Sequence, residues 1–181
     1  MNMIGPMFMR TQLSAIFLLP FIVSSCATKS IETSSELPKR AADFSLPTLD
    51  GKQVSLGQLG GKVVVLDFWA TWCPPCREGL PHLQRLATNS EMAQRGLVVV
   101  AMNEEESQKT IRTFVDQNHY SFTVALDSDG LARRAYDVSE FPTTVIIARD
   151  GLVKSVISGW TQDTARQIDE AVGSALGAPI R

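Results

Sequence analysis

Residues 63–76 read VVVLDFWATWCPPC: an apolar run ends in two cysteines separated by two prolines. The run is rich in β-branched residues and follows Gly60 and Gly61, so residues 63–70 are predicted to form a buried strand. Beyond Cys76, leucines recur at helical spacing. The cysteine pair therefore falls where a strand ends and a helix begins. The free N–H groups and the dipole at a helix start stabilise a thiolate, the form of cysteine that attacks disulfides.

Other uses of a cysteine pair fit this sequence poorly. A zinc site needs a second pair of ligands, but Cys26 lies far upstream and the chain has two histidines, His82 and His119. His82 follows Cys76 by about 600° of helical rotation, so it is expected to point away from that cysteine. Haem attachment needs a histidine at position 77, which is arginine. A purely structural disulfide across so short a loop would contribute little stability, because the entropic benefit of a disulfide grows with the length of the loop that it closes. The sequence thus predicts redox chemistry with no metal and no cofactor.

Residues 67–76 resemble the active-site motif of the thioredoxin superfamily, and the Pro-Pro form resembles its membrane-tethered bacterial branch of TlpA, ResA and CcmG (DsbE) proteins. Residues 138–144, VSEFPTT, resemble the cis-proline loop of the superfamily. Residues 99–107 and 125–130 resemble its central insertion, and the similarity covers residues 41–177. This resemblance implies an α/β, thioredoxin-like fold: a central mixed sheet with helices on both faces, an N-terminal β-hairpin and a central αβ insertion.

Apolar periodicity and turn residues divide the domain into strands and helices. The first strand–helix–strand connection is expected to be parallel and right-handed, and Pro81 is expected to kink the first helix. Predicted strands cover residues 42–47, 52–56, 63–70, 97–103, 122–126, 143–148 and 154–158; predicted helices run from the cysteine pair to about residue 94, and over about 107–118, 131–136 and 162–176.

The first 25 residues differ in kind from the rest of the chain. Arg10 precedes an apolar stretch over residues 13–23, which is typical of a secretory signal and shorter than the roughly 20 residues that a membrane span needs. Residues 23–26, VSSC, resemble the bacterial lipoprotein processing box, which implies that Cys26 is lipidated. An ordinary signal or an uncleaved anchor is the alternative. The predicted organisation is a signal peptide over residues 1–25, the lipidated cysteine and a flexible tether over 26–40, and one thioredoxin-like domain over 41–178.

Composition and charge limit the partners. The 181 residues are 44% hydrophobic, which suffices for one domain with a core. The formal net charge is −2 and no basic run occurs, so no nucleic-acid partner is expected. The prediction is a monomer in the bacterial cell envelope, held on a membrane by the lipid at Cys26 and facing the periplasm or another extracytoplasmic space.

The two cysteines of the motif are predicted to have different roles. Cys73 precedes the helix, so it should be partly exposed and act as the nucleophile. Cys76 lies within the first turn, should be more buried, and resolves the mixed disulfide formed with a partner. Pro74 and Pro75 lack N–H groups that would otherwise hold the thiolate, which argues for a less oxidising couple than a polar dipeptide would give.

A second group of residues is expected to bind the partner protein. Pro142 resembles the cis-proline that faces the disulfide in the superfamily, and a cis bond should leave the backbone of Phe141 free to pair with a bound chain. A trans proline that begins a strand is the alternative. Trp72, next to the nucleophile, should offer the partner an apolar platform, and Pro74 and Pro75 are assigned to the same binding surface.

Two acids are candidates for proton transfer. Asp67 lies in an otherwise apolar run, so burial should raise its pKa. Thioredoxins have an aspartate at the matching position, as proton carrier for the buried cysteine, whereas the TlpA and ResA branch more often has asparagine. Glu106 matches an acid of that branch, with Glu104 and Glu105 as rival candidates. The alternatives are a strand-end Asp67 that reaches solvent and a Glu106 that is a solvated loop charge.

The resemblance implies a thiol-disulfide oxidoreductase that reduces other exported proteins, such as apocytochrome c or a copper-site assembly protein. It also implies a membrane electron donor of the DsbD or CcdA kind. One alternative is a peroxiredoxin, although the P-x-x-x-T-x-x-C spacing of that class is absent here. Another is a copper carrier of the Sco type, which uses a C-x-x-x-C spacing with a distant histidine. The sequence leaves open the direction of electron flow and whether the lipid lies in the inner or the outer membrane.

Overall fold

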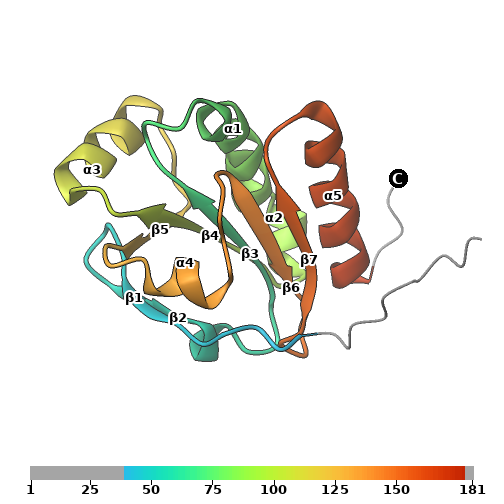
Figure 1. Cartoon of the computed structure of the whole chain (residues 1–181). Helices are drawn as coiled ribbons and strands as arrows, with labels where there is room; N and C mark the ends of the chain where they lie inside the picture. The colour runs from blue at the N-terminus through green and yellow to red at the C-terminus, as the bar shows by residue number, and fades with distance from the viewer. Residues whose placement is uncertain (1–38, 178–181) are drawn as a thin grey trace, which may run out of the picture. The chain divides into compact units, whose positions relative to one another are not determined.

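The computed structural model describes residues 39–177 (Figure 1). The predicted signal peptide, the lipidation at Cys26 and nearly all of the predicted tether lie outside these residues. No helix within residues 39–177 is long and apolar enough to cross a membrane. In chain order the elements are β1 (Ser45–Pro47), β2 (Gln53–Ser55), the 3₁₀ helix η1 (Leu56–Leu59), β3 (Val63–Trp69), α1 (Pro74–Thr88), α2 (Ser90–Gln94), β4 (Leu97–Glu104), α3 (Gln108–Gln117), β5 (Thr123–Asp127), α4 (Leu131–Ala135), β6 (Thr143–Ile147), β7 (Val153–Ser158) and α5 (Gln162–Leu176).

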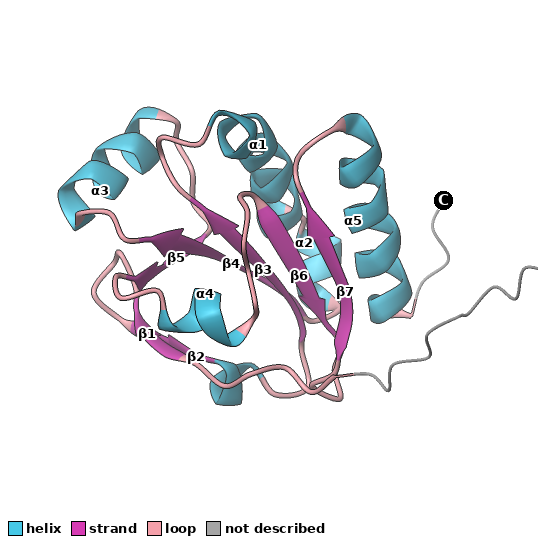
Figure 2. Cartoon of the chain, viewed as in Figure 1, coloured by secondary structure: helices cyan, strands magenta, loops and turns pink. Residues whose placement is uncertain are grey.

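Five strands form one mixed sheet in the order β5-β4-β3-β6-β7 (Figure 2). β3 runs parallel to β4, and β4 runs parallel to β5, whereas β6 runs antiparallel to both β3 and β7. The connection from β3 through α1 to β4 therefore joins parallel strands, as predicted. β1 and β2 form a separate antiparallel hairpin ahead of the sheet. This arrangement confirms the predicted α/β, thioredoxin-like fold.

Helices cover both faces of the sheet. Residues of α1, α3 and α5 form one core cluster with the sheet, and residues of α4 and the β1–β2 hairpin form the other (Figure 1). All seven residues of β3 are buried, because this central strand has a packed layer on each side. Side chains alternate across a strand, so Val65 and Trp69 join the first cluster. Leu66 and Phe68 join the second. The same alternation directs Asp67 to the face that α1 covers.

One predicted helix is in fact two. The sequence predicted a single helix as far as residue 94, but α1 ends at Thr88 and α2 begins at Ser90. Asn89 causes the break: its N–H donates to the carbonyl of Leu86, while its side-chain oxygen accepts from the N–H of Met92. An asparagine that caps the second helix in this way cannot also continue the first. The other boundaries differ from the prediction by a few residues at most.

Candidate active site

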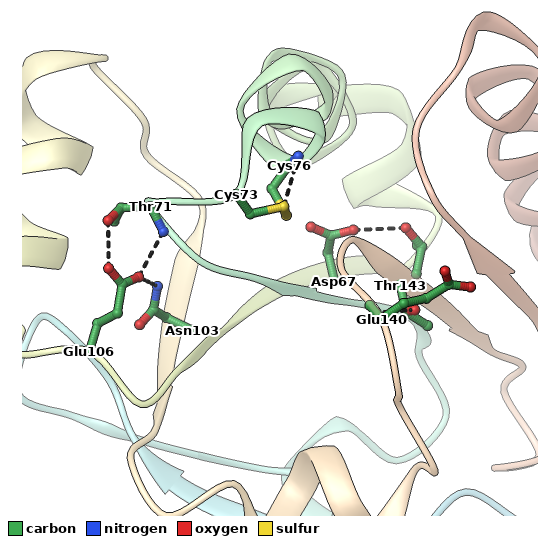
Figure 3. The surroundings of a disulfide bond; sticks show 9 residues. Asp67, Thr71, Cys73, Cys76, Asn103, Glu106, Glu140 and Thr143 are labelled. Carbon is green, nitrogen blue, oxygen red and sulfur yellow. Dashed lines mark hydrogen bonds between the residues drawn. A yellow bond between two sulfur atoms is a disulfide. The ribbon is translucent and has the colours of Figure 1, made fainter.

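The two cysteines of the motif lie at the start of α1, where they form a disulfide with their Cα atoms 5.3 Å apart (Figure 3). Cys73 is the N-cap residue and Cys76 lies in the first turn. The backbone N–H of Cys76 donates to the Cys73 sulfur at 3.2 Å. Pro74 and Pro75 have no N–H to offer, so the N–H of Cys76 is the first one in α1 that can reach this sulfur. The helix start can therefore stabilise a negative charge on Cys73, through a single donor.

The exposure expected for Cys73 is wrong for the oxidised protein. Only 3% of Cys73 and 1% of Cys76 is exposed, and both belong to the core cluster beneath α1. Trp72, next to it, is 66% exposed, and its ring lies 6.1 Å from that of Phe141. A protein that approaches the disulfide therefore meets this aromatic pair at the surface.

Asp67 is the buried acid of the site. It is 8% exposed, which contradicts the alternative that it reaches solvent. Its carboxylate accepts a hydrogen bond of 2.7 Å from the Thr144 hydroxyl on the neighbouring strand β6. Burial raises the pKa of Asp67 from 3.8 to about 7, and the bond from Thr144 opposes this only in part. Near neutral pH the carboxyl group can therefore both take up and release a proton.

Three of the predicted site residues meet at one small cavity of about 10 Å³: Asp67, Cys76 and Pro142. A cavity of this size holds roughly one water molecule. The peptide bond between Phe141 and Pro142 is cis, as expected from the sequence. Because β6 pairs with β3, the loop that carries Pro142 is brought beside the start of α1. The buried acid, the second cysteine and the cis-proline thus line one small pocket.

Glu106 lies on the other side of the motif (Figure 3). Its carboxylate accepts hydrogen bonds from the Thr71 N–H at 2.7 Å, the Thr71 hydroxyl at 2.5 Å and the Asn103 amide at 2.9 Å. Glu106 therefore fixes the loop that leads into Cys73, and it points toward Thr71 whereas Asp67 points toward the cysteine pair. These bonds make Glu106 more than a solvated loop charge.

The two neighbouring glutamates turn elsewhere. The carboxylate of Glu104 lies 3.6 Å from the Arg133 guanidinium, and that of Glu105 lies 3.8 Å from it. Burial and the nearby Asp127 raise the pKa of Glu104 to about 8. Of the three rival glutamates, Glu106 is the one that contacts the loop of the cysteine motif.

Sequence reasoning missed His82. Rotation along an ideal helix placed it away from Cys76, but His82 lines the same cavity as Cys76 and Asp67 and is only 5% exposed. Cys76, Gly79 and His82 of α1 all border the cavity. His82 therefore belongs to the site, although helical rotation directs its side chain away from that of Cys76. The sequence did contain one indication of this, because Cys76, Gly79 and His82 follow one another at intervals of three positions. Gly79 matters here because a Cβ atom would lie 2.8 Å from the Trp160 ring that closes the cavity.

Comparison with known proteins agrees with this geometry. Residues 37–156 match the family model described as the AhpC/TSA family. The thiol-disulfide oxidoreductase ResA of Bacillus cereus is 33% identical over 141 residues, covering 78% of this chain and 79% of ResA.

Solved structures resemble the chain as well. A thioredoxin family thiol:disulfide interchange protein from Chlorobium tepidum has a TM-score of 0.68 and 29% identity, covering 80% of this chain and all of that one. The exposed lipoprotein thioredoxin Etrx1 of Streptococcus pneumoniae has a TM-score of 0.65 and 27% identity, covering 74% of this chain and 99% of that one. The chain belongs to the AhpC/TSA family and, with its thioredoxin-like fold and Cys73–Cys76 pair, it is a thiol-disulfide oxidoreductase of the ResA and DsbE type.

Proposed function

We propose that this oxidoreductase is exported, lipid-anchored at Cys26, and reduces disulfides in other exported proteins. The observation that carries the chemical part is the Cys73 sulfur at the start of α1, where it accepts the N–H of Cys76. The anchoring part is supported by the lipoprotein-like sequence before Cys26. It is also supported by the similarity to an exposed lipoprotein thioredoxin. The domain boundaries follow: signal 1–25, lipidated cysteine and tether 26–40, catalytic domain 41–178.

The reaction begins with the reduced protein. The Cys73 thiolate attacks one sulfur of the partner disulfide, and the other partner sulfur leaves as a thiolate that takes a proton from solvent. Cys76 then gives its proton to the Asp67 carboxylate and attacks the Cys73 sulfur, which releases the second partner thiolate and forms the Cys73–Cys76 disulfide. Two electrons pass from the dithiol to the partner, and a membrane donor of the DsbD or CcdA kind restores the dithiol.

Each residue at the site has a distinct part in this scheme. Asp67 is matched to its task because an acid–base group works best when its pKa lies near the working pH. Glu106 is a positioning residue that holds the loop before Cys73 through Thr71. Trp72 and Phe141 offer the partner an apolar surface next to the sulfurs.

Three prolines complete the binding surface for the partner. Pro142 lines the cavity next to Cys76, in the loop that ends at β6. Pro74 and Pro75 border the sulfurs at the first turn of α1, and Pro74 is exposed. Substrates of the apocytochrome c or copper-site assembly class are proposed on the resemblance to the ResA and CcmG branch alone.

Trapping tests the assignment of the two cysteines. Cys76→Ala removes the resolving attack, so a partner protein should accumulate as a mixed disulfide with Cys73, visible as a reductant-sensitive adduct. Cys73→Ala is the matched control and should trap nothing. Adducts formed by the Cys73→Ala variant instead would reverse the two roles.

Two further measurements test the remaining parts of the proposal. Cys26→Ala should move the protein out of the membrane fraction of cells, and retention there would remove the lipid anchor from the account. Purified protein should not consume peroxide in the presence of a dithiol. Steady peroxide turnover would instead favour the peroxidase alternative.

A further inference from the structure

A groove lies beside the cysteine motif, between the start of α1 and one face of α3. Its volume is about 410 Å³, which is within the range of pockets that hold small ligands. One wall is formed by Thr71, in the loop before α1, and by Arg77, whose backbone N–H donates to the Cys73 carbonyl. The other wall belongs to α3 and includes Lys109 and Phe114. The groove therefore borders the residue that the proposed reaction uses as its nucleophile.

The groove carries two positive charges that are not neutralised within residues 39–177. Neither Arg77 nor Lys109 forms an ion pair with a described residue. The Arg77 guanidinium reaches toward α3 and lies 6.0 Å from the centre of the Phe114 ring. No aspartate or glutamate of the described chain lines the groove. Glu106 contacts Thr71, but its carboxylate already accepts three hydrogen bonds.

Helix stability does not explain the lysine at position 109. Lys109 is the second residue of α3, and the dipole of a helix disfavours a positive charge in the first turn. Both Lys109 and Arg77 are exposed, in a chain whose formal net charge is −2. Two unpaired cations on one groove are therefore suited to meet the negative charge of a bound molecule.

The two sides of the cysteine pair differ in charge. In Figure 3, Thr71 lies on one side of the pair and Glu140 lies on the other, in the loop that leads to the cis-proline. Glu140 is exposed. A partner chain that pairs in an extended form beside Phe141 would cross the sulfurs and continue into the groove. Its residues on the α3 side would meet two cations, whereas its residues on the other side would meet an acid.

We propose that this groove binds acidic side chains of the partner protein, on one side of the disulfide that is to be reduced. The proposal rests on the reductive function proposed above and adds the chemistry of the partner. A carboxylate close to the partner cysteine would meet Arg77 and Lys109 while the Cys73 sulfur attacks. Opposite charges speed the encounter and orient the partner chain. Disulfides flanked by acidic residues on that side are therefore reduced faster than those flanked by basic residues.

Peptides of one common sequence test this directly. Each contains a single cysteine joined to nitrothiobenzoate in a mixed disulfide, with two glutamates, two glutamines or two lysines either before or after the cysteine. Attack by the reduced protein releases nitrothiobenzoate, whose absorbance gives the rate constant. At low ionic strength, two glutamates on one of the two sides should give a rate about tenfold above that of two lysines, the low end of electrostatic steering. Glutamates on the other side, next to Glu140, should give no such gain, and high salt should weaken the preference.

Substitutions in the groove assign the preference to its two cations. Lys109→Gln should lower the ratio of the two rates about threefold, and Lys109→Gln combined with Arg77→Gln should bring it to about one. Because each value is a ratio between peptides, a change in the reactivity of the Cys73 sulfur itself cancels. Lys62→Gln combined with Lys154→Gln is the matched control. It removes two exposed lysines, one before β3 and one on β7, and should keep the native ratio.

The possible failures are distinguishable. A native preference that persists in the Arg77 and Lys109 double variant overturns the groove and leaves the reductive function intact. An equal gain from glutamates on both sides of the cysteine, or an equal loss of the preference in the Lys62 and Lys154 control, also overturns it, because either result indicates a general attraction rather than a docking site. Absence of release from every peptide would overturn the reductive function together with the groove.

Discussion

Replacing Asp67 by asparagine should stabilise the oxidised protein, and the gain should grow as the pH rises from 4 to 7. In the unfolded chain the carboxyl group titrates near its ordinary pKa of 3.8, but in the folded protein burial raises that pKa to about 7. Between these values the unfolded state ionises freely while the folded state must keep the proton. The native protein therefore loses stability with rising pH in this interval, and above pH 7 the loss is constant.

The magnitude follows from the two pKa values. One pKa unit corresponds to about 1.4 kcal/mol, so the carboxyl group lowers the free energy of unfolding by up to about 4 kcal/mol above pH 7. The asparagine side chain of the variant would keep an oxygen that accepts the Thr144 hydroxyl, and it carries no titrating group. The variant should match the native protein near pH 4 and exceed it by roughly 2–4 kcal/mol at pH 8.

Urea unfolding of the oxidised proteins at pH values from 4 to 9 measures this difference directly. Thr144→Val is a useful companion variant, because it removes the bond that favours the charged form, raises the pKa of Asp67 further and should extend the loss of stability to higher pH. A difference between native protein and Asp67→Asn that does not change with pH would refute the reasoning, since it would mean that Asp67 titrates alike in both states.

Three other substitutions test separate parts of the site. Glu106→Gln replaces a charged acceptor of two Thr71 bonds, so it should lower the free energy of unfolding by about 1–2 kcal/mol and slow the attack by Cys73; equal values for variant and native protein would remove its positioning role. Trp72→Ala should raise KM for a protein disulfide about tenfold but leave reaction with a small aromatic disulfide unchanged, and a uniform effect on both would argue against a partner surface. Gly79→Ala should cost about 1–3 kcal/mol in urea unfolding, because its Cβ atom would lie 2.8 Å from the Trp160 ring; a variant as stable as the native protein would show that the ring can move aside.

The sequence predicted the framework well because the strongest patterns were local. The β3 run, apolar except for Asp67, predicted a buried strand, and the motif after it placed both cysteines at a helix start. The position of Asp67 in that run already implied a buried acid, since alternate residues along a strand point to the same face of the sheet. The cis bond before Pro142 followed from the resemblance to the superfamily.

Other features depend on contacts between distant segments, which a single sequence does not display. Nothing near Glu106 indicated that its carboxylate would reach back 35 positions to Thr71 rather than toward the sulfurs. His82 was dismissed on ideal helical rotation, but the cavity is also lined by Trp160 and Asp67, which come from other segments of the chain.

The midpoint potential of the Cys73–Cys76 couple tests the central claim most directly. Within residues 39–177, the backbone N–H of Cys76 donates to the Cys73 sulfur, and the two prolines between the cysteines have no N–H to add. A weakly stabilised thiolate makes a reducing couple, so equilibration with glutathione and dithiothreitol buffers should give a value nearer to about −270 mV, as in thioredoxin, than to about −120 mV, as in DsbA. A value close to that of DsbA would contradict the reductive role.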